Sequence, residues 1–405
     1  MKLVGESCRI CRSQTRKILD LGSAPPANSL KERASDVQTA YPLILDWCQT
    51  CHNVQLRDTL VSEVLYRDYL YVTPRSSTLR AHYEYLLSYL LANGYVSETS
   101  FVVEAGSNAG HFLEYLKPAV SGILGVDPAE RICAAANDAG IPTVCDFFSP
   151  TSAEAILSAH GPADLVVARH CMAHNESPHA MMAAASVLLA SDGHLLIENA
   201  YILNTIENGE FDQVYHEHMF YYSILSMRAL LALHGMHLVD VLMSLVHGGS
   251  IIFVAAPGLG GTITGAIEAY ESRERQMLTA NAFARFAKRA EETKVRLADL
   301  VVSLVADGRS VYSYGATAKG NTLLNYVSLT SELIPYCADS TPMKQGLFLP
   351  GSSIEVISEE AALNDPPDYF LLTAWNYQDE IITKVRSAGN YHSKFIVPIP
   401  FVRVL

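Results

Sequence analysis

The chain has 405 residues, of which 49% are hydrophobic and 18% are charged, a composition typical of soluble globular proteins with two or three domains. Its net charge of −13 argues against nucleic-acid binding, because phosphate contacts depend on clustered lysine and arginine. We find no export signal and no apolar run long enough to span a bilayer. We therefore expect a cytoplasmic protein with neither a nucleic acid nor a membrane as its partner.

Two Cys-x-x-Cys knuckles stand near the start of the chain. Four thiolates form a complete tetrahedral shell for Zn²⁺, and disulfides are not expected in the cytoplasm. Because the protein fills all four positions, we expect a structural zinc ion rather than a catalytic one. The alternative is four reduced thiols. The predicted ligands are Cys8, Cys11, Cys48 and Cys51, and a segment such as 24–29 must loop out between them.

An aromatic connector at 66–74 and a helix-like run at 79–92 follow the knuckles. Aromatic clusters of this kind mostly pack in cores. One tyrosine at a domain boundary is nevertheless able to reach into an active-site cleft.

From residue 101 the pattern changes to strands that alternate with helices. A buried strand at 101–104 leads into a glycine-rich turn at 105–110 that opens a helix. The next strand, 122–127, ends in Asp127, about 20 residues after the turn, where a carboxylate is placed to bind a ribose diol.

The spacing Glu-x-Gly-x-x-x-Gly in this turn differs from the dinucleotide fingerprint Gly-x-Gly-x-x-Gly. It favours S-adenosylmethionine, which has an adenosine but no pyrophosphate. The alternative is a doubly wound domain whose turn holds no ligand. The candidate cofactor-binding residues are Glu104, Gly106, Asn108, Gly110, Asp127, Asp146 and Phe147.

The segment 211–223 carries an unusual density of proton-transfer groups. Tyr215, His216, Glu217 and His218 place a phenol, two imidazoles and a carboxylate on consecutive residues, close to apolar ones. An apolar wall moves such pKa values toward working pH, as a general acid or base requires. The alternative is a polar loop whose histidines cap a helix or are satisfied in a core.

Two further histidines favour a functional interpretation. Strands predicted at 164–168 and 194–199 belong to the same sheet, and His170 and His174 follow the first of them. Residues just beyond the carboxyl ends of parallel strands face the ligand crevice. We therefore expect these histidines to converge with the segment 211–223.

A helix and two strands are expected between 224 and 255, with a turn at 247–250. This turn either presents backbone donors to a ligand or is a simple hairpin. From 267 to 304 the pattern is helical with one apolar face, which predicts a long linking helix.

A second alternating region begins near residue 307. A strand at 310–314 is followed by a small-residue turn at 315–320 and a short helix at 321–327. Backbone amides at the helix start, together with Lys319, form a candidate anion site. The alternative role of this unit is dimerisation or packing. Its later strands are predicted at 333–337, 369–373 and 394–397.

The order of these motifs resembles the sugar C-methyltransferases that act on nucleotide-linked keto-deoxysugars. The resemblance covers nearly the full length, and its most specific parts are Tyr-His-Glu-His at 215–218 and Ala-Lys-Gly-Asn-Thr at 318–322. One departure is Ala109, where an acidic residue is expected in the glycine-rich turn at 105–110. We call this turn the donor turn, because S-adenosylmethionine is the expected methyl donor. The other shared motifs are the paired knuckles, Pro-Pro-Ala-Asn-Ser at 25–29, Glu-Ala-Gly-Ser-Asn-Ala-Gly at 104–110, His-Gly-Gly-Ser at 247–250, Lys-Gln-Gly at 344–346 and Leu-Pro-Gly at 349–351.

The resemblance implies an α/β protein built from three parts. These are a zinc-binding domain at 1–70, a Rossmann-like methyltransferase domain at 71–260 that uses S-adenosylmethionine, and a C-terminal Rossmann-like domain at 306–405 that helps to hold the substrate. The linking helix at 261–305 lies between the last two.

The resemblance also implies the chemistry. His218 is the base that removes the proton at carbon 3 of a 4-keto sugar, and Glu217 orients or charges its imidazole. Tyr71, His174 and Tyr215 hydrogen-bond the sugar and stabilise the enolate, and methyl transfer from S-adenosylmethionine follows. The candidate substrate-binding residues are His247, Lys319 and Asn321, of which the last two are expected near the nucleotide diphosphate.

Two other functions are compatible with the sequence. An O- or N-methyltransferase for a small polar acceptor needs a base but no ketone. A non-catalytic binding protein with this fold has no use for the intact Tyr215, Glu217, His218 and Asp127. We expect a monomer or a dimer.

Overall fold

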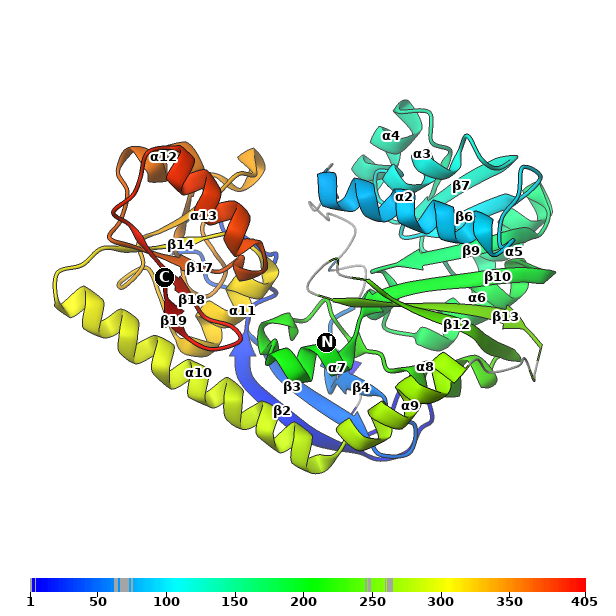
Figure 1. Cartoon of the computed structure of the whole chain (residues 1–405), viewed down its shortest axis with the longest axis horizontal. Helices are drawn as coiled ribbons and strands as arrows, with labels where there is room; N and C mark the ends of the chain where they lie inside the picture. The colour runs from blue at the N-terminus through cyan, green and yellow to red at the C-terminus, as the bar shows by residue number, and fades with distance from the viewer. Residues whose placement is uncertain are drawn as a thin grey trace.

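The computed structural model describes residues 2–3, 5–61, 65, 73, 76–244, 246, 249–258, 260 and 265–405. Figure 1 shows two α/β lobes, one on each side of the long strands β2 and β3, with the helix α10 running beneath them. Within the described ranges, no helix is both long and apolar enough to cross a membrane.

The N-terminal domain is a small antiparallel sheet with the strand order β11-β4-β3-β2. Its outer strand β11 comes from the segment 211–223, far away in the sequence, and pairs Phe220 with Gln55 and Tyr221 with Val54. The strands of this region are β1 (Lys2–Leu3), β2 (Thr15–Ala24), β3 (Tyr41–Cys48), β4 (Val54–Leu56), β5 (Asp58–Thr59) and β11 (Phe220–Tyr221).

The middle domain is a seven-stranded sheet with the order β12-β13-β10-β9-β6-β7-β8. The strands from β10 to β8 are parallel, whereas β13 lies antiparallel between β10 and β12. The strands are β6 (Phe101–Ala105), β7 (Gly122–Asp127), β8 (Thr143–Cys145), β9 (Ala163–Arg169), β10 (Leu189–Ala200), β12 (Met236–Ser244) and β13 (Ser250–Pro257).

Both faces of this sheet are buried, because successive residues of a strand point to opposite sides. Val102 packs with α2 and α3, whereas its neighbour Val103 belongs to the core on the other face. The helices are α2 (Ser77–Ala92), α3 (His111–Leu116), α4 (Glu130–Asp138), α5 (Pro150–His160), α6 (Pro178–Leu188), α7 (Ile202–Asn208) and α8 (Ile224–Ala232), with the short helices η1 (Met172–His174) and η2 (Phe211–Gln213).

The C-terminal domain is a six-stranded sheet with the order β16-β15-β14-β17-β18-β19, parallel except for β19. Its strands are β14 (Val311–Tyr314), β15 (Tyr336–Asp339), β16 (Glu355–Ser358), β17 (Tyr369–Leu372), β18 (Lys394–Val397) and β19 (Arg403–Val404). Its helices are α11 (Ala318–Val327), α12 (Glu359–Asn364) and α13 (Gln378–Ser387), with η4 (Pro342–Lys344) and η5 (Trp375–Tyr377).

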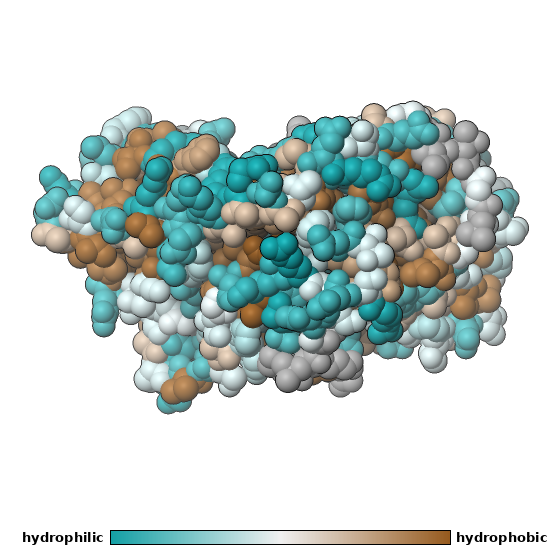
Figure 2. All heavy atoms as spheres, turned by 90° about the horizontal axis from the view of Figure 1, so that it is seen from below, coloured by the Kyte–Doolittle hydropathy of each residue, from teal (hydrophilic) through white to brown (hydrophobic). Residues whose placement is uncertain are grey.

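The predicted single linking helix is wrong, because this segment forms two helices, α9 (Gly265–Met277) and α10 (Ala280–Ala306). The side chain of Thr279 caps the amide of Ala282 and starts α10 afresh. One face of α10 is buried, with the ring of Phe283 lying 5.0 Å from that of Trp47 in β3. Figure 2 shows the underside of the molecule, where α10 runs, as a mixture of hydrophilic and hydrophobic residues.

The predicted α/β fold class is confirmed: a small N-terminal domain is followed by two α/β domains in the expected order. Two strand starts were clearly misplaced: β10 begins at Leu189 rather than at 194, and β15 begins at Tyr336 rather than at 333. Pro335 precedes it, and a proline has no amide hydrogen to donate to a neighbouring strand.

Candidate active site

The four knuckle cysteines come together as predicted. Their sulfur atoms all lie within 4.8 Å of one another, and all four cysteines are free rather than disulfide-bonded. The amide of Ile10 points at Sγ of Cys8 (3.4 Å), a donor that suits a thiolate. This donor set fits Zn²⁺, and because the protein supplies all four ligands, the ion is structural.

The glycine-rich turn follows β6 at the carboxyl edge of the middle sheet. Gly106 has φ +65°, and a Cβ there would lie 2.5 Å from Cβ of Cys171. Gly110 has φ +72°, and a Cβ there would lie 2.6 Å from Ile141. Only glycine fits these two positions, because each has a left-handed backbone conformation and lies against a packed side chain.

Asp127 ends β7 beside this turn, as predicted. Its carboxylate accepts the amides of Asn108 (2.9 Å) and Ala129 (3.0 Å). Burial raises the pKa of Asp127, and the two amides oppose that effect. Asp146 and Phe147 follow the adjacent strand β8, so the candidate cofactor residues lie along one edge of the sheet.

Glu104 lies deeper than a simple ligand contact requires. It is buried, and Oε1 accepts from Nε of Arg169 (2.9 Å). The guanidinium carbon of Arg169 lies 4.7 Å from the ring centroid of Tyr83 and 4.4 Å from that of Phe112. Burial raises the pKa of the Glu104 carboxyl, and Arg169 counteracts that rise. Oε2 of Glu104 makes no hydrogen bond to any residue that the structure describes.

Within the Tyr-His-Glu-His motif, the two members that are partly exposed are Tyr215 and His218, whereas His216 and Glu217 are buried. The hydroxyl of Tyr215 lies 2.5 Å from Nε2 of His218. Nδ1 of His218 lies 3.1 Å from the carbonyl oxygen of Gln213. Since a carbonyl only accepts, Nδ1 carries the hydrogen, and Nε2 is the basic nitrogen.

The surroundings keep the His218 imidazole neutral. Burial lowers its pKa well below the ordinary histidine value, and the neighbouring His174 and the positively charged Lys319 lower it further. The ring of His174 packs edge-on at 4.9 Å between ring centroids. Burial and His170 lower the pKa of His174 to about 4.

A second pair of imidazoles, His82 and His170 around Glu198, was not predicted from the sequence. Glu198, fully buried near the end of β10, lies 2.8 Å from Nε2 of His82 and 3.8 Å from Nε2 of His170. Burial alone would raise the pKa of Glu198, but the two histidines hold it well below its ordinary value. An acid inside the apolar strand at 194–199 was the available signal.

The buried members of the motif have positioning contacts. Oε1 of Glu217 accepts from Nδ2 of Asn28 (3.0 Å), which belongs to the Pro-Pro-Ala-Asn-Ser loop. Nε2 of His216 lies 3.3 Å from the carbonyl oxygen of Tyr41. The carbonyl of Gln213 thus faces Nδ1 of His218. That Glu217 orients or charges this imidazole stays a prediction.

Lys319 and Asn321 have different environments. Nζ of Lys319 lies 3.6 Å from Oε2 of Glu210 and 5.3 Å from the ring centroid of Trp375. Asn321 is only 3% exposed, and its Nδ2 donates to the carbonyl of Ala27 (2.6 Å). Lys319 lies close enough to His218 for its charge to lower the pKa of that histidine, whereas Asn321 fastens the Pro-Pro-Ala-Asn-Ser loop to α11.

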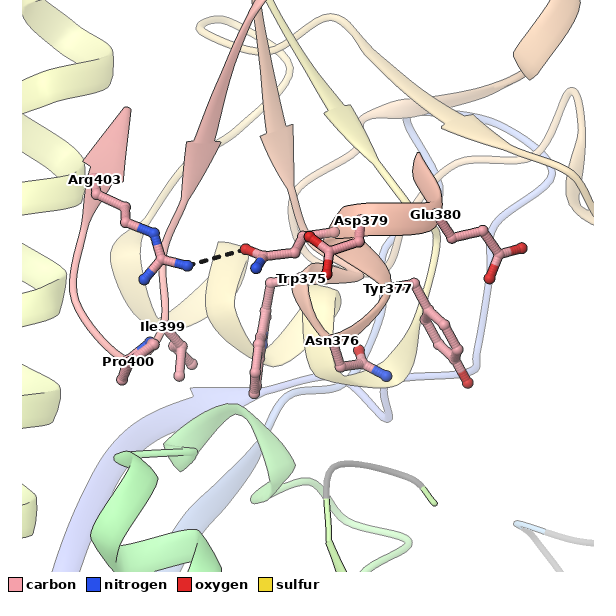
Figure 3. Close-up of a pocket in the computed structure, with 9 residues that line it drawn as sticks. Trp375, Asn376, Tyr377, Asp379, Glu380, Ile399, Pro400 and Arg403 are labelled. Atoms are coloured by element: carbon pink, nitrogen blue, oxygen red, sulfur yellow. Dashed lines mark hydrogen bonds between the residues drawn. The ribbon is translucent and has the colours of Figure 1, made fainter. Parts of the chain in front are cut away.

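A cavity of about 380 Å³ opens at the carboxyl edge of the C-terminal sheet. Figure 3 shows Trp375 projecting from this cavity toward the middle domain, where its Nε1 donates to Oδ2 of Asp212 (2.6 Å). Burial raises the pKa of Asp212 to about 6, and Lys319 opposes the rise. The other lining residues are Asn376, Tyr377, Gln378, Asp379, Glu380, Ile399, Pro400 and Arg403.

Two predicted site residues, Tyr71 and His247, lie outside the described residues. The described end of the aromatic connector does reach the donor turn, because the amide of Thr73 donates to Oδ1 of Asn108 (3.0 Å).

The sheet order, the donor turn and the adjoining imidazoles define an S-adenosylmethionine-dependent methyltransferase with a structural zinc site. Family models match three successive regions: a putative zinc-binding domain at 8–66, a methyltransferase domain at 78–241 and a C-methyltransferase C-terminal domain at 245–400. The chain is 36% identical over 406 residues to C-methyltransferase NovU of Streptomyces niveus, with 99% of this chain and 97% of that protein covered. The chain therefore belongs to the C-methyltransferase family.

Two solved methyltransferase structures each match less than half of this chain. Magnesium protoporphyrin IX methyltransferase of Synechocystis PCC 6803 with bound SAM is 15% identical, at a TM-score of 0.37, over 49% of this chain and 99% of that one. The N-methyltransferase NodS of Bradyrhizobium japonicum is 15% identical, at a TM-score of 0.35, over 46% of this chain and 99% of that one. Similarity at this level carries no argument about the acceptor.

Proposed function

We propose that the chain methylates carbon 3 of a nucleotide-linked 4-keto-deoxysugar by way of an enolate. The observation that carries this proposal is the partly exposed Tyr215–His218 pair, in which Nε2 of a neutral imidazole is the basic nitrogen. A carbon beside a ketone must lose a proton before it can attack a methyl group. S-adenosylmethionine supplies that methyl group on a positively charged sulfur.

The resting contacts indicate how the pair would work. The hydroxyl of Tyr215 occupies Nε2 of His218, so a substrate carbon must displace this hydroxyl to reach the base. The displaced hydroxyl is then able to donate to the keto oxygen. His218 takes the proton from carbon 3, and the negative charge moves onto the oxygen that Tyr215 holds.

Lys319 supports the same step through its charge. Its positive field lowers the pKa of His218, which keeps the base unprotonated. The same field favours the negative charge of an enolate. Because a base contributes only about 10²- to 10⁴-fold, stabilisation of the enolate must supply much of the remaining acceleration.

We assign the nucleoside part of the substrate to the cavity in the C-terminal domain. Trp375 and Tyr377 offer aromatic faces on which a base can stack. The carboxylates of Asp379 and Glu380 are able to accept hydrogen bonds from ribose hydroxyls, but their charge repels phosphate. We therefore expect the diphosphate closer to Lys319. Tyr377→Ala should then raise the KM of the sugar nucleotide more than that of the donor.

The decisive experiment is incubation with a nucleotide-linked 3-deoxy-4-keto sugar in deuterated water, with and without the donor, followed by mass spectrometry. We expect exchange of one carbon-bound hydrogen without the donor and addition of one methyl group with it. His218→Asn should lower both by about 10²- to 10⁴-fold, whereas the matched control His160→Asn, at an exposed position, should keep both. Absence of both in the wild type, with the donor bound, would instead indicate O- or N-methylation of another acceptor.

A further inference from the structure

The zinc-binding domain contacts the chain on both sides of His218. β4 pairs with β11, so Phe220 lies opposite Gln55. The amide of Leu56 donates to the carbonyl oxygen of Met219 (3.0 Å). On the other side, Asn28 holds Glu217. The proposed base is therefore followed directly by a stretch, 219–221, whose backbone is paired with another domain.

Arg9 adds a side-chain contact to this connection. It stands in the first knuckle, between Cys8 and Ile10, and is 8% exposed. Its Nη2 donates to the carbonyl oxygens of Leu56 (2.7 Å) and Met219 (3.1 Å). Its guanidinium carbon lies 4.6 Å from the ring centroid of Phe220.

Met219 joins the two catalytic histidines through the backbone. Its carbonyl accepts from Arg9 and Leu56, while its amide donates to the carbonyl of Ala173 (2.8 Å). Met219 follows His218 directly, and Ala173 precedes His174 directly. A shift of Met219 would therefore change the spacing of the two imidazoles.

The burial of Arg9 costs free energy, because only part of its guanidinium is hydrogen-bonded. Burying a guanidinium is unfavourable unless its donors are satisfied. Nε and Nη1 of Arg9 make no hydrogen bond to any residue in the part of the chain that the structure describes. Its Nη2 donates to two backbone carbonyls, and one of them adjoins the proposed base. A sequence keeps such a buried charge where position matters more than stability.

We propose that Arg9 is a positioning residue for catalysis: it couples the first zinc knuckle to Met219 and thereby fixes His218 against His174. The catalytic consequence rests on the proposed function, whereas the coupling itself does not. A misplacement of about 1 Å can cost about 100-fold in rate. Arg9 thus gives the zinc domain a role in setting the geometry of the base.

The test compares Arg9→Met with the matched control Arg57→Met. Arg57 is another partly buried arginine of the zinc domain, and its guanidinium holds the buried Asp46 (2.8 Å) rather than the segment 211–223. For Arg9→Met we expect about a 100-fold loss of solvent exchange and of kcat, with zinc content and donor Kd unchanged. The apparent pKa of the acidic limb of its pH–rate profile should rise toward the ordinary histidine value. Arg57→Met should lower Tm but keep kcat and the pH profile.

A second measurement is independent of the substrate. By amide hydrogen–deuterium exchange, Arg9→Met should loosen peptides that cover 213–221 but not those that cover β6, and Arg57→Met should leave 213–221 protected. Wild-type kcat in Arg9→Met, or an equal loss in Arg57→Met, would overturn the proposal. If Arg9→Met does not fold, Arg9→Lys replaces it: a loss of about tenfold or more supports positioning, and a wild-type rate overturns it. No exchange of the sugar by the wild type would refute the proposed function alone, and the amide measurement would still decide the coupling.

Discussion

The hydroxyl of Tyr215 and Nε2 of His218 lie 2.5 Å apart, while the opposite ring nitrogen of His218 faces the carbonyl of Gln213. The imidazole is thereby fixed in one tautomer, and its basic nitrogen is directed at a group that a substrate can replace. Burial keeps this ring uncharged, because it lowers the pKa of His218. A weakly basic but always available nitrogen suits a carbon acid only if the enolate is stabilised as well.

Substitutions in this pair should separate the contribution of the base, His218, from that of the hydrogen-bonding hydroxyl of Tyr215. His218→Asn removes the proton acceptor, and we expect a loss of about 10²- to 10⁴-fold in solvent exchange. Tyr215→Phe keeps the base but removes the hydroxyl, and we expect about a 10²-fold loss. Exchange rates measured by mass spectrometry check both variants. Unaltered exchange in His218→Asn would remove this histidine from the mechanism.

The lowered pKa of His174 predicts a pH dependence of stability. Its folded-state pKa of about 4 lies below the ordinary value of 6.5, so between these values the unfolded chain binds a proton that the folded chain does not. The free energy of unfolding should therefore fall as the pH drops from about 6.5 to about 4, by at most about 1.4 kcal/mol per pH unit for this group. Urea unfolding at several pH values measures it. His174→Asn is the comparison, because its stability should fall less over the same range.

The donor turn should not tolerate a side chain at Gly106. Gly106→Ala places a Cβ against Cys171 in a left-handed conformation, which should cost about 2 kcal/mol or more. Gly94→Ala is the matched control, since Gly94 has φ +69° but nothing within 4 Å of the added Cβ. We expect the first variant to lose donor affinity by calorimetry, and the second to lose only stability, by about 1 kcal/mol. Equal donor affinity in both variants would contradict a donor site at this turn.

The knuckle cysteines should hold one zinc ion per chain. Cys11→Ser removes a thiolate from the cluster, and we expect loss of zinc together with a lower Tm, because metal binding contributes to folding. Cys145→Ser, at an exposed cysteine outside the cluster, should keep both. Elemental analysis and thermal unfolding give the two readouts. Full zinc content in Cys11→Ser would show that the ion is held differently.

Much of the fold could be predicted from local patterns. The strands at 101–104 and 122–127 were visible because buried parallel strands have continuous apolar runs, and the glycine turn between them has a fixed spacing. The knuckles were visible because four thiolates need only two short motifs. In contrast, the break at Thr279 was missed, since the apolar periodicity continues through it while a side-chain cap restarts the helix.

The sequence by itself determined the chemical groups of this protein: the four zinc ligands, the donor turn with Asp127, and the Tyr-His-Glu-His motif. The tertiary structure alone decided which partner each group has. Gln213 rather than Glu217 faces Nδ1 of His218, Asn321 binds the loop at Ala27, and Arg9 reaches Met219. These contacts join residues through backbone carbonyls, and any residue type carries a carbonyl. The folded path of the chain, rather than side-chain identity, therefore sets the geometry of the site.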